Sequence, residues 1–154
     1  MLSFRAVSAD EPPAARLIAA MIDELTPLYG RIDGPGMPSA SAADFAPPGG
    51  TFLLGEEDGA AVCAGGVKGL SPRCGEIKRM YVVPEARGRG VARALLGALE
   101  QAAAELGYET VRLDTGAHQP HAKALYLDAG YRPIEDYNGN PAASFWGEKR
   151  LDGA

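Results

Sequence analysis

A glycine-rich turn between an apolar strand and a long helix constrains this chain more than any other feature. The turn spans residues 87–92 (Arg-Gly-Arg-Gly-Val-Ala) and lies between a strand pattern over 75–83 and a helix pattern over 89–106. Glycine lets a ligand approach the backbone closely, and the unpaired N–H groups of a helix's first turn attract anions. Arg87 and Arg89 add positive charge. The turn therefore predicts a phosphate-binding site, and the alternative is a tight connection that binds nothing.

Length and composition are typical of a soluble globular protein. The 154 residues suffice for one domain that buries about two thirds of its unfolded surface. A net charge of −5 argues against nonspecific binding of nucleic acid. The apolar runs fall short of the roughly 20 residues that span a membrane, and the first residues lack the apolar core of a signal peptide. We expect a single cytoplasmic domain over residues 1–154 with no membrane or nucleic-acid partner, and the sequence leaves a homodimer open.

Hydrophobic periodicity and turn signals predict an alternation of strands and helices. Asp10 is expected to cap the first helix, and a long loop rich in Pro and Gly follows over 26–50. The helix over 89–106 carries one apolar face, formed by residues 91, 95, 96, 99 and 103. The expected strands are 2–7, 51–56, 60–70, 75–83, 110–114, 131–135 and 144–151, and the expected helices are 10–25, 39–45, 89–106 and 120–129.

The cysteines and histidines do not form a metal motif. Cys63 and Cys74 would lie at opposite ends of a hairpin, and we expect both to be reduced structural thiols. His118 and His121 flank the start of a predicted helix, and no Cys or carboxylate stands at ligand spacing from them. We expect these histidines to be exposed or capping residues, and we expect no metal.

Two separated blocks of residues carry a family resemblance. One is the turn 87–92, in which Arg, two residues, Gly, one residue and Ala follow each other. The other is 119–131, a polar residue followed by an Ala-x-x-Leu-Tyr helix that ends in Gly-Tyr, and the stretch 137–149 also fits. With the order of elements, these blocks resemble the GCN5-related N-acetyltransferase (GNAT) family. The resemblance implies an α/β (α+β) fold, with a mixed, mostly antiparallel central sheet of about seven strands flanked by helices.

The resemblance also implies acetyl-CoA as cosubstrate. The pyrophosphate would lie on the backbone of the turn 87–92, and the pantetheine arm would pair with residues 80–82 like an added strand. Where the family often has an Asn before the last helix, this chain has Gln119, whose amide can also donate and accept. The implied cosubstrate-binding residues are Met80, Tyr81, Val82, Arg87, Gly88, Arg89, Gly90, Val91, Ala92, Gln119 and Tyr126.

Glu76 is the candidate general base. It lies eleven positions before Arg87, a spacing similar to that of the glutamate that acts as base in histone-acetylating members. Only about one lysine-like amine in 2,500 is neutral at pH 7, so the amine's proton needs an acceptor. A glutamate at its ordinary pKa is a base about 8 kcal/mol too weak, so Glu76 would act after burial or through a water. The structural alternative is an ion pair with Lys78 or Arg112.

Tyr126 stands where the family places the acid that protonates the departing CoA thiolate. A thiol pKa of about 8.5 and a tyrosine pKa of about 10 make full proton transfer uphill by roughly 2 kcal/mol, which permits concerted donation. The structural alternative is a core aromatic on an amphipathic helix. The predicted activity is therefore acetyl transfer from acetyl-CoA to a primary amine by direct attack in a ternary complex.

Two other classes of protein compete with this prediction. A GNAT domain that senses acyl-CoA without turnover would not need Glu76 and Tyr126 beside the phosphate turn. A P-loop nucleotide-binding protein would need a Gly-Lys-Ser/Thr ending, which 87–92 lacks. The prediction favours a small-molecule amine over a protein as the acceptor. The identity of the acceptor and the length of the acyl group stay open.

Several further residues lie near the expected acceptor cleft. Asp114, at the end of the fifth strand, is expected to cap the next turn. The glycines at 65, 66 and 69 mark either a bulge or a close approach of the acceptor. By resemblance, the residues in or beside the loops of the cleft are Tyr29, Arg31, Tyr137, Asn138 and Trp146.

Overall fold

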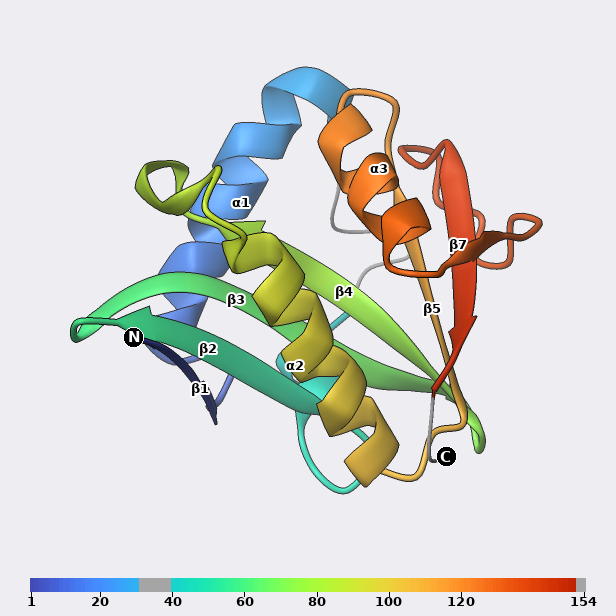
Figure 1. Cartoon of the computed structure of the whole chain (residues 1–154), viewed down its shortest axis with the longest axis horizontal. Coiled ribbons are helices and arrows are strands. Elements are labelled where there is room, and N and C mark those ends of the chain that lie inside the picture. The colour runs from blue at the N-terminus through green and yellow to red at the C-terminus, as the bar shows by residue number, and fades with distance from the viewer. Residues whose placement is uncertain (31–39, 152–154) are drawn as a thin grey trace.

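A twisted sheet of seven strands forms the centre of the fold, with helices on both faces (Figure 1). The structure is a computed structural model that describes residues 1–30 and 40–151. The strand order is β1-β2-β3-β4-β5-β7-β6, and every neighbouring pair is antiparallel except β4 and β5. The strands are β1 Leu2–Ala6, β2 Thr51–Glu57, β3 Ala60–Ser71, β4 Cys74–Val82, β5 Thr110–Thr115, β6 Arg132–Pro133 and β7 Phe145–Arg150.

Helices cover the sheet because each presents one apolar face to it. α1 (Ala14–Tyr29) packs on one face with the buried side chains of Phe52 and Leu54, and a short 3-10 turn, η1 (Ala42–Phe45), completes this layer. α2 (Val91–Glu105) and α3 (Pro120–Asp128) lie on the other face (Figure 1). The apolar face predicted for α2 is confirmed, since Val91, Leu95, Leu96, Leu99 and Ala103 are all buried.

The sheet opens into a wedge between β4 and β5, and Figure 1 shows the two strands diverging toward α3. The parallel pairing covers only Cys74–Glu76 against Thr110–Arg112. Beyond it, β4 carries a bulge opposite Gly65, and Arg79 within the bulge has a φ of 60°. A bulge bends and twists its strand, so β4 leaves the plane of β5 where a ligand can enter.

Most predicted elements are confirmed, and the differences have local causes. α1 begins at Ala14 without a side-chain cap, because Asp10 accepts a hydrogen bond from Ser8 rather than capping the helix. The helix runs to Tyr29, beyond its predicted end at residue 25. The predicted strand 131–135 shortens to Arg132–Pro133. Part of the predicted loop 26–50 lies outside the described residues. None of the helices in the described part of the chain has the length and apolar character needed to cross a membrane.

The hairpin glycines pack against the core. A bulge is present as one alternative predicted, with register shifts at Ala64/Gly66 and at Gly69/Ser71. A Cβ built on Gly66 would lie 2.4 Å from a Phe45 ring carbon, so the group that approaches this glycine closely is a core side chain of the protein itself.

Cys63 and Cys74 are both free thiols, placed at opposite ends of the hairpin as expected.

Candidate active site

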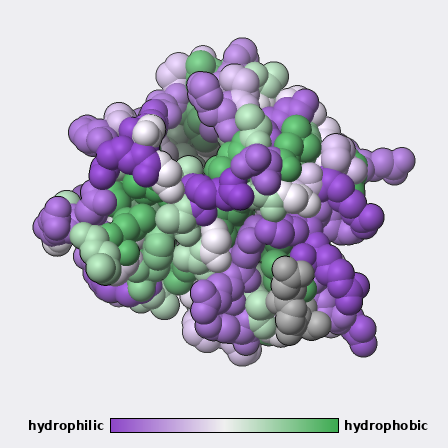
Figure 2. All heavy atoms as spheres, in the orientation of Figure 1, coloured by the Kyte–Doolittle hydropathy of each residue, from purple (hydrophilic) through white to green (hydrophobic). Residues whose placement is uncertain are grey.

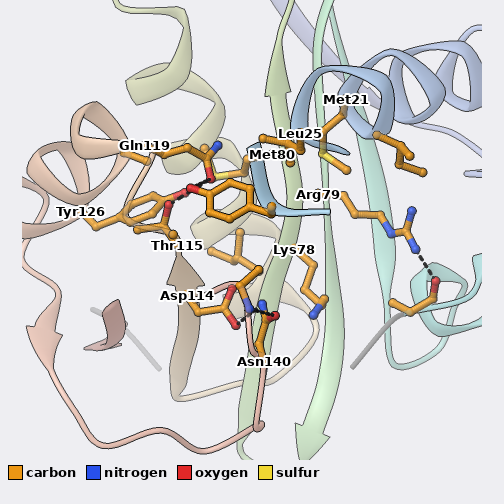
Figure 3. Close-up of a pocket in the computed structure, with 17 residues that line it drawn as sticks. Met21, Leu25, Lys78, Arg79, Met80, Asp114, Thr115, Gln119, Tyr126 and Asn140 are labelled. Atoms are coloured by element: carbon orange, nitrogen blue, oxygen red, sulfur yellow. Dashed lines mark hydrogen bonds between the residues drawn. The ribbon is translucent and has the colours of Figure 1, made fainter. Parts of the chain in front are cut away.

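A cavity of about 210 Å³ occupies the wedge between β4 and β5 (Figure 3). α1 supplies an apolar wall, β4 and β5 supply the sides, and α3 closes one end. The labelled side chains of Figure 3 show Met21 and Leu25 across the cavity from Tyr126 and Asp114. The residues that line the cavity include Met21, Leu25, Lys78, Met80, Asp114 and Tyr126.

Tyr126 projects its hydroxyl into this cavity from α3. The residue is 7% exposed, and its Oη lies 3.7 Å from Met80 Sδ on β4, a weak acceptor. Burial and, to a lesser extent, the negative charge of Asp114 raise the pKa of Tyr126 above the ordinary tyrosine value. The phenol therefore keeps its proton at neutral pH and is available as a hydrogen-bond donor.

Glu76 is buried beside the cavity and does not line it. Its Oε2 accepts hydrogen bonds from Tyr137 Oη at 2.7 Å and from Asn138 Nδ2 at 3.2 Å. Its Oε1 lies 3.8 Å from Lys68 Nζ and 3.9 Å from Lys78 Nζ. The structural alternative predicted an ion pair of Glu76 with Lys78 or Arg112. The pair with Lys78 is present, whereas Arg112 pairs with Glu148. These contacts hold the carboxylate in place, so a proton would reach Glu76 from the cavity only through a water or another side chain.

Asp114 lines the cavity at the end of β5, and the sequence did not indicate its surroundings. Its Oδ2 accepts hydrogen bonds from Asn138 Nδ2 at 2.6 Å and from Asn140 Nδ2 at 3.3 Å. The expectation that Asp114 caps the following turn is wrong, because the loop 136–143 folds back to supply these amides. Asp136 begins that loop by accepting the backbone N–H groups of Asn138 and Gly139.

Asn138 joins the two carboxylates. Its Nδ2 donates to both Asp114 and Glu76, and its Oδ1 accepts from Trp146 Nε1 at 3.0 Å. A carboxylate only accepts and an indole only donates, so these partners fix the orientation of the amide. Tyr137 and Trp146, expected near the cleft, thus support this network rather than line the cavity, while Tyr29 does line it. Arg31 lies outside the described residues.

The glycine-rich turn leads directly into α2. Gly88 and Gly90 both have a φ of 80°, and a Cβ on either would meet nothing within 4 Å. Gly90 is the N-cap of α2, so the free first-turn N–H groups of the helix face the space beside the turn. The arginines are engaged, since Arg87 Nη2 lies 2.8 Å from Glu24 Oε1 and Arg89 Nη1 lies 2.9 Å from Glu57 Oε1. Figure 2 shows hydrophilic side chains over this loop, beside a hollow.

The end of β4 offers an unpaired edge between the turn and the cavity. β5 pairs with β4 only as far as Glu76, so no strand among the described residues pairs with 80–82 on that side. Met80 lines the cavity, whereas Tyr81 is buried on the α1 face with Arg87 over its ring. Gln119 also lines the cavity, and its Oε1 lies 3.5 Å from the hydroxyls of Thr115 and Tyr29.

These parts suit a phosphorylated cosubstrate that carries a reactive group on an extended arm. The helix N-terminus offers free N–H groups to an anion, and the edge of β4 leads from there to the cavity beside Tyr126. In the described ranges 1–30 and 40–151, no group of three or more His, Cys, Asp or Glu side chains is placed to hold a metal ion.

Comparison with known proteins identifies the family. Residues 18–131 match the Acetyltransferase (GNAT) family, and the chain belongs to it. An IAA acetyltransferase of Azospirillum brasilense is 30% identical over 146 residues, which cover 89% of this chain and 93% of that protein. The crystal structure of a Klebsiella pneumoniae protein described as an acyl-CoA N-acyltransferase matches with a TM-score of 0.77, at 28% identity and covering 98% of each chain.

A structure with the cosubstrate bound also shares the fold. A GNAT acetyltransferase of Elizabethkingia anophelis with acetyl-CoA bound has a TM-score of 0.71 at 16% identity, covering 97% of this chain and 98% of that one. The seven-stranded mixed sheet predicted by the resemblance is thereby confirmed. As a member of this family, the protein is an acetyl-CoA-dependent acetyltransferase.

Proposed function

We propose that this acetyltransferase transfers the acetyl group of acetyl-CoA to a primary amine of a small molecule, by direct attack in a ternary complex. The observation that carries the proposal is the cavity in the wedge of the sheet. It lies at the end of the unpaired β4 edge and holds the Tyr126 hydroxyl, the Asp114 carboxylate and an apolar wall from α1. A recessed cavity of about 210 Å³ suits a small acceptor better than a protein surface.

The reaction begins when the nitrogen lone pair of the amine attacks the thioester carbonyl carbon. The C–S bond then breaks, and the sulfur leaves with negative charge. Tyr126 donates its proton to that sulfur. Because the pKa of Tyr126 is raised, the proton is not transferred early; the phenol first donates a hydrogen bond, which strengthens as the negative charge develops on sulfur. The phenol regains its proton from solvent.

The amine must also lose a proton, and Glu76 is proposed as its destination through a relay. Both Glu76 oxygens are engaged with Tyr137, Asn138 and two lysines, and Glu76 does not line the cavity. A water or an intervening polar side chain would therefore carry the proton.

The cosubstrate would lie along the unpaired strand edge. Its pyrophosphate would contact the backbone of residues 87–92, and its arm would pair with residues 80–82. Arg87 and Arg89 would then either exchange their carboxylate partners for phosphate oxygens or stay paired and shape the turn. Gln119 would be within reach of the arm from the N-terminus of α3.

Free thiol released from acetyl-CoA in the presence of a panel of primary amines tests this proposal. We expect amine-dependent thiol release and a product heavier than the amine by one acetyl group, detected by mass spectrometry. A protein that only senses acyl-CoA would bind CoA in calorimetry and release no thiol with any amine in the panel. That result would contradict the proposal.

A further inference from the structure

We propose that Asp114 is the residue that contacts the acceptor's nitrogen, and that the acceptor is a primary amine carried on an apolar body. This inference rests on the proposed function and deepens it. Of the carboxylates in the network, Asp114 lines the cavity and Glu76 does not. Figure 3 shows the Asp114 carboxylate in the same cavity as the Tyr126 ring.

One oxygen of Asp114 is held and the other is available. Oδ2 accepts the two amide hydrogen bonds from Asn138 and Asn140. Within residues 1–30 and 40–151, no hydrogen bond or ion pair reaches Oδ1. A half-buried carboxylate with one oxygen fixed and one unpaired is oriented to accept an N–H from a ligand in the cavity.

Asp114 and Tyr126 line the same cavity from β5 and α3 (Figure 3), and the charge of Asp114 contributes to the raised pKa of Tyr126. A nitrogen bound to Asp114 Oδ1 would therefore lie near the group proposed to protonate the sulfur. This proximity places nucleophile and leaving group within one cavity, as direct attack requires.

The opposite wall indicates what the nitrogen is attached to. Met21, Ile22 and Leu25, which lie within about one turn of α1, present apolar side chains to the cavity. Arg79 extends away from Asp114 toward the carbonyl of Ala40 (Figure 3). An alkylamine or arylalkylamine would place its carbon body against α1 and its nitrogen against Asp114.

Asp114 has a defined part in the reaction. As the N–C bond forms, the nitrogen gains positive charge, and the carboxylate stabilises that charge and accepts one N–H proton at Oδ1. The C–S bond breaks, and the sulfur takes a proton from Tyr126. Because the amine binds as an ammonium, it first releases one proton through water to free its lone pair, and after the attack Asp114 passes the second proton to solvent or through a water toward Glu76. Sulfur gains one proton from Tyr126, and the phenol is reprotonated from solvent, so each turnover releases one proton. Asn138 is a positioning residue, because it holds Asp114 and Glu76 with a single amide.

The test compares a charged ligand with its neutral isostere. With CoA present, we measure calorimetrically the binding of 2-phenylethylamine and of 2-phenylethanol, which share the apolar body. We expect the wild type to bind the amine about tenfold more tightly or better, and Asp114→Asn to bind both alike. Asp58→Asn, an exposed hairpin substitution outside the cavity, is the matched control and should keep the preference.

Two more variants keep the inference falsifiable if Asp114→Asn fails to fold. Asp114→Glu keeps the charge but moves the oxygens, so it should retain the preference for the amine while kcat falls, because the nitrogen is displaced from the thioester. Asn138→Ala should weaken the preference in part and shift the pH profile of kcat/KM. Preservation of the wild-type kcat and ligand preference in both variants would overturn the inference.

Binding and turnover separate this inference from the proposed function. If the wild type acetylates amines and Asp114→Asn does so at the same kcat/KM, the role of Asp114 is wrong and the function stands. If no amine releases thiol, the function fails, and the amine-to-alcohol preference still decides whether Asp114 recognises the nitrogen. Absence of that preference in the wild type would overturn the inference directly.

Discussion

The role of the Tyr126 hydroxyl decides whether this residue is a catalytic tyrosine or a core aromatic. We predict that Tyr126→Phe lowers kcat about 10- to 10³-fold and leaves CoA affinity nearly unchanged, because the hydroxyl is needed chiefly as charge develops on sulfur. Steady-state kinetics and calorimetry measure the two effects. The matched control is Tyr131→Phe, which removes the buried hydroxyl that donates to Glu100 outside the cavity. Wild-type turnover by Tyr126→Phe would make Tyr126 a core residue.

Glu76→Gln should give a different pattern, because it removes the proposed final acceptor of the amine's proton. We predict that the variant loses most activity at low pH, where the amine is most protonated, and regains part of it as pH rises. The pH profile of kcat/KM from about pH 6 to 9.5 measures this. Tyr137→Phe, which removes the 2.7 Å bond to Glu76 but keeps the charge, should retain the wild-type profile shape. A uniform loss across the pH range in Glu76→Gln would indicate a structural role.

At the scale of single residues, the sequence predicted only part of the site. Tyr126, which the structure places in the cavity, and the turn 87–92, which leads into α2, were selected as candidates because each belongs to a motif that is local in the chain. The contacts of Asp114 were not predicted, because Asn138 and Asn140 lie more than 20 positions away and reach it through side-chain turns in the loop 136–143. The signal available was the repeated Asn in that loop, a residue type that often bonds its own backbone.

Among the elements, the start of α2 gives the sharpest prediction. We predict that Gly90→Val strongly weakens CoA binding, since Gly90 has a φ of 80° that a β-branched residue resists, and its side chain would occupy space beside the helix N-terminus. Calorimetry with CoA measures the loss. Unchanged affinity would refute the assignment of the pyrophosphate to this turn.

The matched control lies in the same helix. Gly97 is within α2, has ordinary helical backbone, and a Cβ there would meet nothing within 4 Å. Gly97→Ala should raise stability by up to about 1 kcal/mol through helix propensity and leave CoA affinity unchanged. A loss of affinity in this variant would show that α2 tolerates no change, and Gly90→Val would then say little about phosphate.

Elements with strong periodicity were predicted well, and those that depend on distant partners were not. α2 matches its predicted range within two residues because a continuous apolar stripe defines it. β6 covers only Arg132–Pro133, which pair in register with β7, and the backbone N–H of Ile134 adds one further hydrogen bond to Trp146. The wedge between β4 and β5 depends on the bulge at Arg79, and the sequence suggested a bulge only through the glycines opposite it.

The whole molecule buries ionisable groups that hold their protons more tightly when folded. Burial raises the pKa of the Cys63 thiol to about 11, and it is also the largest cause of the raised pKa values of Tyr126, Tyr131 and Tyr137. Negative charges beside the tyrosines, on Asp114, Glu100 and Glu76 respectively, act in the same direction. The two apolar layers on the faces of the sheet thus make folding sensitive to alkaline pH.

We predict that the free energy of unfolding is insensitive to these groups up to about pH 8 and falls as pH rises further. Below the pKa of the unfolded groups, both states hold the protons; above it, the unfolded chain releases them first and is favoured. Each such group costs about 1.4 kcal/mol per pH unit, first Cys63 and then, above about pH 10, the tyrosines. Urea unfolding followed by circular dichroism at pH 8, 10 and 11 measures the decline. Tyr131→Phe should be less stable at pH 8 because Glu100 loses one of its donors and keeps Lys149. The variant should nevertheless lose less stability between pH 10 and 11 than the wild type, and equal losses would contradict the assignment.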